Sequence, residues 1–320
     1  MNLLVRKTFN LAQTTLFRCN VRRISGEAVL KTQSGIIRTL SESTPVEYLQ
    51  KFVISLHNTT GLPWWATIVC TTIFLRSAVT IPLAIYQHYI LAKVQNARIE
   101  FTELQKELQK EVAIAIKLYN WDDKTAKFHY KRSLKKQWNL LIVRDNCHPV
   151  KASLLIWFQI PLWVCFSTTL RNIVYKLPEN APNSVTVFNE LSTSSFYWIS
   201  SLTEVDSTFI LPILFGIMNL LIIEIQSLSK NAPPTKIQKF IINFGRGLTI
   251  VLVPIAASVP SCLPLYWTTS SLYGCLQNLV LMSPKFKRIC CIPTTSTDLQ
   301  KPYSHILKGF KRKFLFLKKE

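Results

Sequence analysis

Five apolar segments alternate with polar, mostly basic stretches along this chain. They cover residues 62–86, 150–175, 209–228, 237–258 and 263–282. Each is long enough to cross a hydrocarbon core of about 30 Å as an α-helix. Trp64 and Trp65 open the first segment, as expected of aromatic residues at a membrane interface. The pattern predicts an all-α membrane protein with a bundle of five transmembrane helices, the last two joined in a tight antiparallel hairpin.

The composition supports this class and excludes several others. Hydrophobic residues make up 48% of the 320-residue chain and charged residues only 17%, whereas a soluble domain carries about 25% charged residues. The 18 Phe and 8 Trp residues exclude a disordered chain. A net charge of +21 in so apolar a chain indicates basic loops beside a membrane rather than a nucleic-acid reader, so no DNA partner is expected.

The sequence contains no recognisable motif for catalysis or cofactor binding. It has no G-x-x-x-x-G-K-[ST] phosphate loop, no G-x-G-x-x-G and no H-E-x-x-H. The eight cysteines form no C-x-x-C pair, which is typical of packing residues rather than of a disulfide framework or a zinc site. We therefore expect no catalytic residue, no metal, no cofactor and no enzymatic activity.

Residues 1–40 have the composition of a mitochondrial transit peptide. Five basic residues precede the first acid, Glu27, and no uninterrupted apolar run of the secretory type is present. An apolar stripe recurs at helical spacing, at Val5, Phe9, Ala12 and Leu16. The alternative is an ordinary basic surface helix. Residues 41–61 are then predicted to be an N-terminal segment in the intermembrane space.

Basic residues are distributed asymmetrically between the two sides of the predicted bundle. The stretches 87–151, 229–239 and 283–320 contain 26 Lys and Arg residues, whereas 177–208 and 258–262 contain none. The positive-inside rule places the basic stretches, including the tail 283–320, in the matrix. The 177–208 loop then faces the intermembrane space. This predicts a multi-pass protein of the mitochondrial inner membrane with its C-terminus in the matrix.

The stretch 87–149 between the first two spans is predicted to form an amphipathic helical hairpin on the matrix side. Apolar residues recur three and four apart from Phe101 to Leu118, and again from Tyr130 to Leu141. The sequence Asn-Trp-Asp-Asp at 120–123 interrupts the pattern and supplies an N-cap with acids in the first turn of the second helix. The charges of the hairpin form a solvated surface, a contact site for nascent chain, ribosome or acidic lipid, or both.

Charged residues inside the spans need a reason to be there, because an isolated charge is costly in hydrocarbon. Arg76 follows Trp64 by 12 residues, or about 18 Å along a helix, which places it near the middle of the bilayer. We expect Arg76 to face a wet cavity or an acid. Glu224 and Arg246 lie in the matrix halves of the third and fourth spans, where they could pair across helices.

Uncharged polar residues also recur on the spans. Each alone is weak evidence for a site, since interhelical hydrogen bonds use such side chains routinely. Grouped around Arg76, they would line a polar groove for a substrate. The candidate groove residues are Arg76, Thr71, Gln159, Asn219, Glu224 and Gln277.

Five strings of this sequence resemble the YidC/Oxa/Alb family of membrane insertases. They are TGLPWW at 60–65, FLRSAVTIPL around Arg76, YQHYILAKVQN at 86–96, VRDNCHPVKA at 143–152 and WFQIPLW at 157–163. The resemblance extends over about residues 58–285. It is closest to the mitochondrial branch that assembles cytochrome c oxidase.

This resemblance implies a five-span insertase core at 62–282 in which Arg76 lines a groove open toward matrix and lipid. It also implies that the protein passes the C-terminal tail of cytochrome c oxidase subunit 2 from the matrix to the intermembrane space. Inner-membrane lipids and oxidase assembly factors are the other partners considered. General Oxa-type members carry a longer ribosome-binding extension than the tail 283–320, so weak or no ribosome binding is expected. A passive assembly scaffold or chaperone and a general co-translational insertase remain as alternatives.

Overall fold

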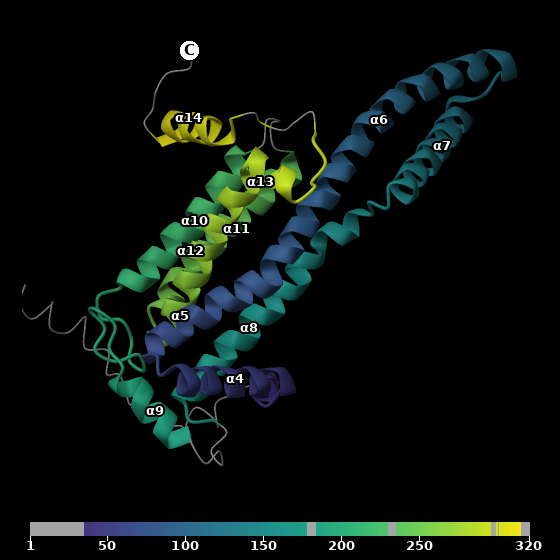
Figure 1. The fold of residues 1–320 in the computed structure, drawn as a ribbon. Coiled ribbons are helices and arrows are strands. Elements are labelled where there is room, and N and C mark those ends of the chain that lie inside the picture. The colour runs from purple at the N-terminus through teal and green to yellow at the C-terminus, as the bar shows by residue number, and fades with distance from the viewer. Residues whose placement is uncertain (1–34, 178–183, 230–234, 296–298, 300, 315–320) are drawn as a thin grey trace, which may run out of the picture.

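The computed structural model of this protein describes residues 35–177, 184–229, 235–295, 299 and 301–314 (Figure 1). The predicted transit peptide, 1–40, therefore lies almost wholly outside the described residues. Within them the chain is helical and forms no β-strand, only two isolated bridges, which confirms the all-α class. The helices are α3 (Gly35–Ser41), α4 (Thr44–Thr60), α5 (Trp64–Leu75), α6 (Ile81–Tyr119), α7 (Asp123–Arg144), α8 (Leu154–Val174), α9 (Ser184–Thr193), α10 (Ile210–Leu228), α11 (Lys236–Ala256), α12 (Cys262–Met282), α13 (Pro284–Ile289) and α14 (Pro302–Phe314).

Four helical stretches in the described part of the chain are long and apolar enough to cross a membrane. They are Trp64–Tyr119, Pro149–Val174, Ile210–Leu228 and Lys236–Ala256. The fifth predicted span coincides with α12, which is 21 residues long but does not belong to these four. Thr268, Ser270 and Ser271 interrupt its apolar sequence, and all three are buried. Because α12 packs against α5 and α10, its polar side chains point at other helices.

The first predicted span does not end where the hairpin begins. α5, a π-helical turn at Arg76–Thr80 and α6 form one continuous helix of 56 residues. Pro82 lies in the first turn of α6. Proline has no N–H to donate to the carbonyl four residues earlier, and just before it the amide of Ile81 bonds to the carbonyl of Arg76, five residues back. The widened turn allows the helix to continue past the proline.

α6 and α7 pack against each other as a helical hairpin that projects away from the other helices (Figure 1). The chain reverses at Asn120, whose φ of 48° ends α6 in the left-handed region. Asp122, within the stretch 120–123 predicted to supply an N-cap, occupies the N-cap position of α7, but its side chain makes no capping hydrogen bond. Between the helices, the rings of Phe101 and Trp138 meet with their centroids 5.1 Å apart.

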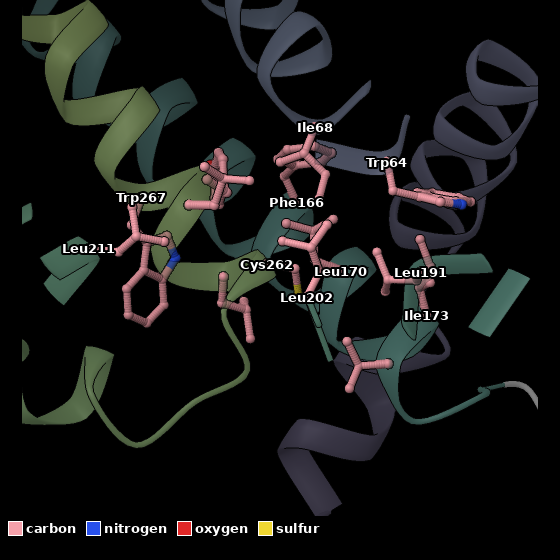
Figure 2. Close-up of a cluster of buried hydrophobic side chains, with 14 of the residues drawn as sticks. Trp64, Ile68, Phe166, Leu170, Ile173, Leu191, Leu202, Leu211, Cys262 and Trp267 are labelled. Carbon is pink, nitrogen blue, oxygen red and sulfur yellow. The ribbon is translucent and has the colours of Figure 1, made fainter. Parts of the chain in front are cut away.

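The main hydrophobic core lies at one end of the bundle (Figure 2). It gathers the first turns of α5, α10 and α12 with the last turns of α8. Trp64, Phe166 and Leu202 are each at most 1% exposed. Leu202 belongs to the 177–208 loop, and Trp64 comes directly after the segment before residue 62. Packed side chains therefore close this end of the molecule.

Residues 41–61, predicted only as a segment outside the bilayer, contain the helix α4, which covers the closed end. Val46 and Val53, seven residues apart, are fully buried. The hydroxyl of Thr169 on α8 donates to the carbonyl of Val46 at 3.3 Å. Near the C-terminal end of α4, His57 stacks on Trp64 at a centroid distance of 4.2 Å. This helix therefore depends on contacts with α5 and α8.

The prediction that the last two spans pack against each other as a tight hairpin is wrong. α11 and α12 are joined by a short connection, but both pack mainly against α10 and make little contact with each other. The 201–206 loop binds the connection between the two helices. The amides of Ser261 and Cys262 donate to the carbonyls of Glu204 and Leu202 at 2.7 and 3.0 Å. Leu202 is fully buried, so the loop is packed against the start of α12.

Candidate functional site

Arg76 lies at the start of the π-helical turn and points toward α12. Its Nε donates to the hydroxyl of Ser270 at 3.1 Å, and Nη2 donates to the same oxygen. No carboxylate among the described residues forms a salt bridge with Arg76, whose side chain is half-buried. Arginine carries more N–H donors than one hydroxyl can satisfy. The guanidinium is thus a half-buried cation with donors left for another acceptor.

A small cavity adjoins the guanidinium between α5, α8 and α12. It has a volume of about 10 Å³, which is close to the room that one water molecule needs. Its lining residues are Thr72, Leu75, Arg76, Thr80, Gln159, Leu162, Trp163 and Tyr266. The cavity is therefore a small pocket beside Arg76 that apolar and polar side chains line together, and not a wide channel in this conformation.

One face of α12 carries the groups that meet the π-helical turn. Ser270, Tyr273, Gly274 and Gln277 recur three and four apart, which places them on the same side of a helix. Tyr273 shares a hydrogen bond of 2.6 Å with Ser77, and Gln277 accepts one from Thr80 at 3.4 Å. A Cβ added at Gly274 would lie 3.9 Å from Nη1 of Arg76. The glycine thus leaves space at the side of the guanidinium.

The structure brings together only part of the predicted groove. Arg76 and Gln159 line the same cavity, and Gln277 reaches it through Thr80. Thr71, the residue directly before Thr72 in α5, is fully buried, and its hydroxyl has no hydrogen-bond partner among the described residues. Whether these groups bind a substrate remains a prediction.

The two candidates on α10 are engaged elsewhere. Asn219 donates to the hydroxyl of Ser271 at 3.0 Å, which joins α10 to α12. Glu224, with its side chain 10% exposed, accepts from Arg246 of α11 at 2.6 Å, so the ion pair suggested by the sequence is confirmed. Its other carboxylate oxygen is bound by Lys313 of α14. The sequence analysis missed this second cation, because nothing in the pattern indicated that the tail folds back onto α10.

Sequence reasoning also missed the partner face of Arg76. Ser270, Tyr273 and Gly274 were read as part of an apolar span, although their spacing on one helical face was visible. The available signal was the row of small and hydroxyl side chains, since such residues allow helices in a membrane to approach closely.

These features define a class, a helical membrane protein with a cation set inside a bundle that is closed at one end. The model of the 60Kd inner membrane protein family matches residues 55–288, and the chain belongs to this family, the YidC/Oxa group. The motif resemblance seen in the sequence is thereby confirmed.

Individual relatives place the similarity more narrowly. The chain is 41% identical over 285 residues to "Cytochrome c oxidase assembly protein COX18, mitochondrial" of Mus musculus, which covers 89% of this chain and 85% of the relative. It is 42% identical over 282 residues to the Homo sapiens protein of the same name, covering 88% and 84%. "Mitochondrial inner membrane protein OXA1" of Arabidopsis thaliana is 28% identical over 249 residues, or 78% of this chain and 52% of the relative.

Proposed function

We propose that this protein acts in cytochrome c oxidase assembly in the mitochondrial inner membrane, where it moves the C-terminal tail of oxidase subunit 2 from matrix to intermembrane space. The names of the relatives at 41 and 42% identity support the process and the compartment. The observation that carries the transport step is Arg76, a cation inside the bundle whose guanidinium donates to a single serine hydroxyl, that of Ser270, among the described residues. This action makes and breaks no covalent bond, so no enzymatic activity is proposed.

In the proposed topology, α12 is the fifth span, and the α6–α7 hairpin and the tail lie in the matrix. Helix ends that meet the basic stretches gather opposite the closed end. The burial of the polar residues of α12 supports its role as a central span, because their cost in hydrocarbon is avoided by contact with neighbouring helices.

The physical role of the site is to make a polar route less costly for a hydrophilic tail. Burying an unpaired polar group costs several kcal/mol, and the hydroxyl and amide groups around Arg76 offset part of that cost. An acid of the tail would displace water beside the guanidinium and pair with its remaining donors. The membrane potential, positive outside, then favours outward movement of the acid by about 2.3 kcal/mol per charge per 100 mV.

A protease-protection experiment on newly made oxidase subunit 2 tests this proposal. In mitochondria lacking the protein, we expect the tail of subunit 2 to remain in the matrix and to be protected. Re-expression of the full chain should restore cleavage from outside. Tails that are exported normally but fail to assemble would contradict transport and favour the passive scaffold. A defect shared by many newly made membrane proteins would favour a general co-translational insertase.

A further inference from the structure

The tail helix α14 lies crosswise at the end of the bundle opposite the closed core (Figure 1). Three contacts hold it there. The hydroxyl of Tyr303 donates to the carbonyl of Leu279 near the end of α12 at 2.9 Å. A Cβ at Gly309 would lie 3.0 Å from a methyl group of Leu228, the last residue of α10. The ion pair of Lys313 with Glu224 is the third contact. The helix therefore lies at the level where two helices of the bundle end.

The exposed surface of α14, which includes the ring of Tyr303 although its hydroxyl is bonded to Leu279, has two chemically different sides. Tyr303 and Leu307 lie four residues apart on one side, and they are 50% and 58% exposed. Lys308, Lys311 and Arg312 share another side and are exposed. No described segment covers the apolar pair, and the first turn of α14 contains no acid. This arrangement of an apolar side next to a cationic one is typical of helices that lie in a membrane interface.

We propose that α14 is an interfacial helix that binds the anionic lipid headgroups around the ends of α10 and α12. Tyr303 and Leu307 would enter the boundary of the acyl chains, while Lys308, Lys311 and Arg312 contact phosphates. The site goes beyond tail export and does not depend on it, since it requires only that the bundle is in a membrane.

The charge and the exposed side chains together favour lipid over RNA. Basic residues alone would suit either polyanion. A phosphate backbone offers nothing to Leu307, whereas a bilayer buries it. The position of α14 at the ends of two helices adds a geometric reason, because headgroups surround that level of the protein.

Fluorescence quenching in nanodiscs tests the proposal with the full-length protein. An environment-sensitive fluorescent amino acid is placed at Leu307, and in separate samples at Tyr303 or at His305, which is exposed on another side of α14. The discs contain lipids brominated in the acyl chain, with either phosphatidylcholine alone or added phosphatidylglycerol. We expect labels at 307 and 303 to be quenched several-fold more than the label at 305, and more strongly in the anionic discs.

A charge variant of α14 and a matched control elsewhere in the protein show whether the basic residues of α14 themselves hold the helix at the lipid surface. Replacing Lys308, Lys311 and Arg312 by Gln should weaken docking by about a hundredfold, given the attraction of each basic residue to an anionic surface. Quenching at 307 should then fall to its level in neutral discs. Replacing Lys124, Lys127 and Lys131 of α7 by Gln removes the same charge elsewhere and should leave quenching unchanged.

Two results would overturn the proposal. One is equal, weak quenching at 303, 305 and 307 in both kinds of disc. The other is protection of the 307 label from a water-soluble quencher by added ribosomal RNA but not by anionic lipid, which would assign the helix to a ribosome instead.

Discussion

At the scale of single residues, Arg76 should act through its charge. A guanidinium that binds one serine hydroxyl has donors left for a carboxylate of a passing chain. We expect Arg76→Lys to retain most export, because an ammonium also pairs with acids. Arg76→Ala should slow export of an acid-rich tail by roughly tenfold, the equivalent of one hydrogen bond to a charged group. The measurement is the rate of tail export by protease protection.

The control for this prediction varies the substrate. Neutralising Asp and Glu in the tail should shrink the difference between Arg76→Ala and the parent protein, and protein abundance should stay normal. An equal defect for acidic and neutral tails, with loss of the protein, would mean that Arg76 only stabilises the bundle.

Replacing Glu224 should destabilise the protein, whereas replacing Arg76 should not. Its carboxylate binds Arg246 and Lys313 at once, so Glu224→Gln leaves two cations without their acid. Removal of one partner from a buried pair costs about 3–5 kcal/mol, and the partial exposure of both cations reduces this to about 1–3 kcal/mol. We expect lower thermal stability and faster proteolysis of the tail.

An exposed ion pair of the hairpin supplies the comparison. Glu100 binds Arg144, and their side chains are 43% and 55% exposed. Glu100→Gln should therefore change thermal stability by less than about 1 kcal/mol. If Glu224→Gln and Glu100→Gln behave alike, the interpretation of Glu224 as the anchor of α14 is wrong.

The partners of these residues show what a sequence can specify at this scale. The sequence indicated that Glu224 and Arg246 could pair, because they carry opposite charges at similar depth in two different spans. The partner of Arg76 could not be found in this way. Ser270 is uncharged and lies 194 residues away in the chain, so only the packing of α12 onto α5 brings the two together.

At the scale of elements, the α6–α7 hairpin should loosen without affecting the spans. Leu104, Leu108, Leu134 and Trp138 are half-buried between its helices. Replacing all four by Ala should cost about 1–3 kcal/mol for each side chain, less than full burial would give. We expect rapid hydrogen exchange and protease cleavage in α7 with the membrane helices still inserted. Full export activity with a cleaved hairpin would show that the element is dispensable.

Helix periodicity predicted the long elements well and the short ones poorly. In the spans and the hairpin, apolar residues recur over many helical turns. Their helical pattern can therefore be recognised however the helices pack against one another. α4 and α14 were not predicted, because short helices are marginal alone and are stabilised by docking. The continuous helix through Arg76–Thr80 was not predicted for another reason. A proline is expected to interrupt a regular α-helix, whereas the π-helical turn before Pro82 lets this helix continue.

At the scale of the whole molecule, the charge asymmetry predicts its orientation. Cysteines introduced at Ser195 and Lys308, both exposed, should react from opposite sides of the membrane. In mitoplasts, an impermeant thiol reagent should label position 195 and not position 308. The exposed native thiols of Cys70 and Cys291 are first replaced by Ser.

The informative outcomes of this labelling experiment are simple. Labelling of position 308 with protection of position 195 would reverse the orientation. Labelling of both positions from outside would require an even number of membrane crossings between residues 195 and 308. One of α10, α11 and α12 would then not cross the membrane.

The sequence defined the class of the molecule but not where its core lies. Apolar residues are spread along every span. Their pattern does not show which of them point at neighbouring helices, which at loops and which at lipid. At the closed end, side chains of α4 join the same core as those of α9 and the 201–206 loop, although α4 lies far from both in the chain. Such contacts follow from tertiary packing alone.

The one-sided core has an electrical consequence. A dense apolar layer around Trp64, Phe166 and Leu202 excludes ions and water, and so behaves as an insulator. In an open conformation of the proposed groove, water from the opposite end would carry the potential of that compartment with it. The full voltage across the membrane would then fall over the thickness of this layer and not over the whole bilayer. An acid held beside Arg76 would have only a short distance to travel to gain all of its electrical energy.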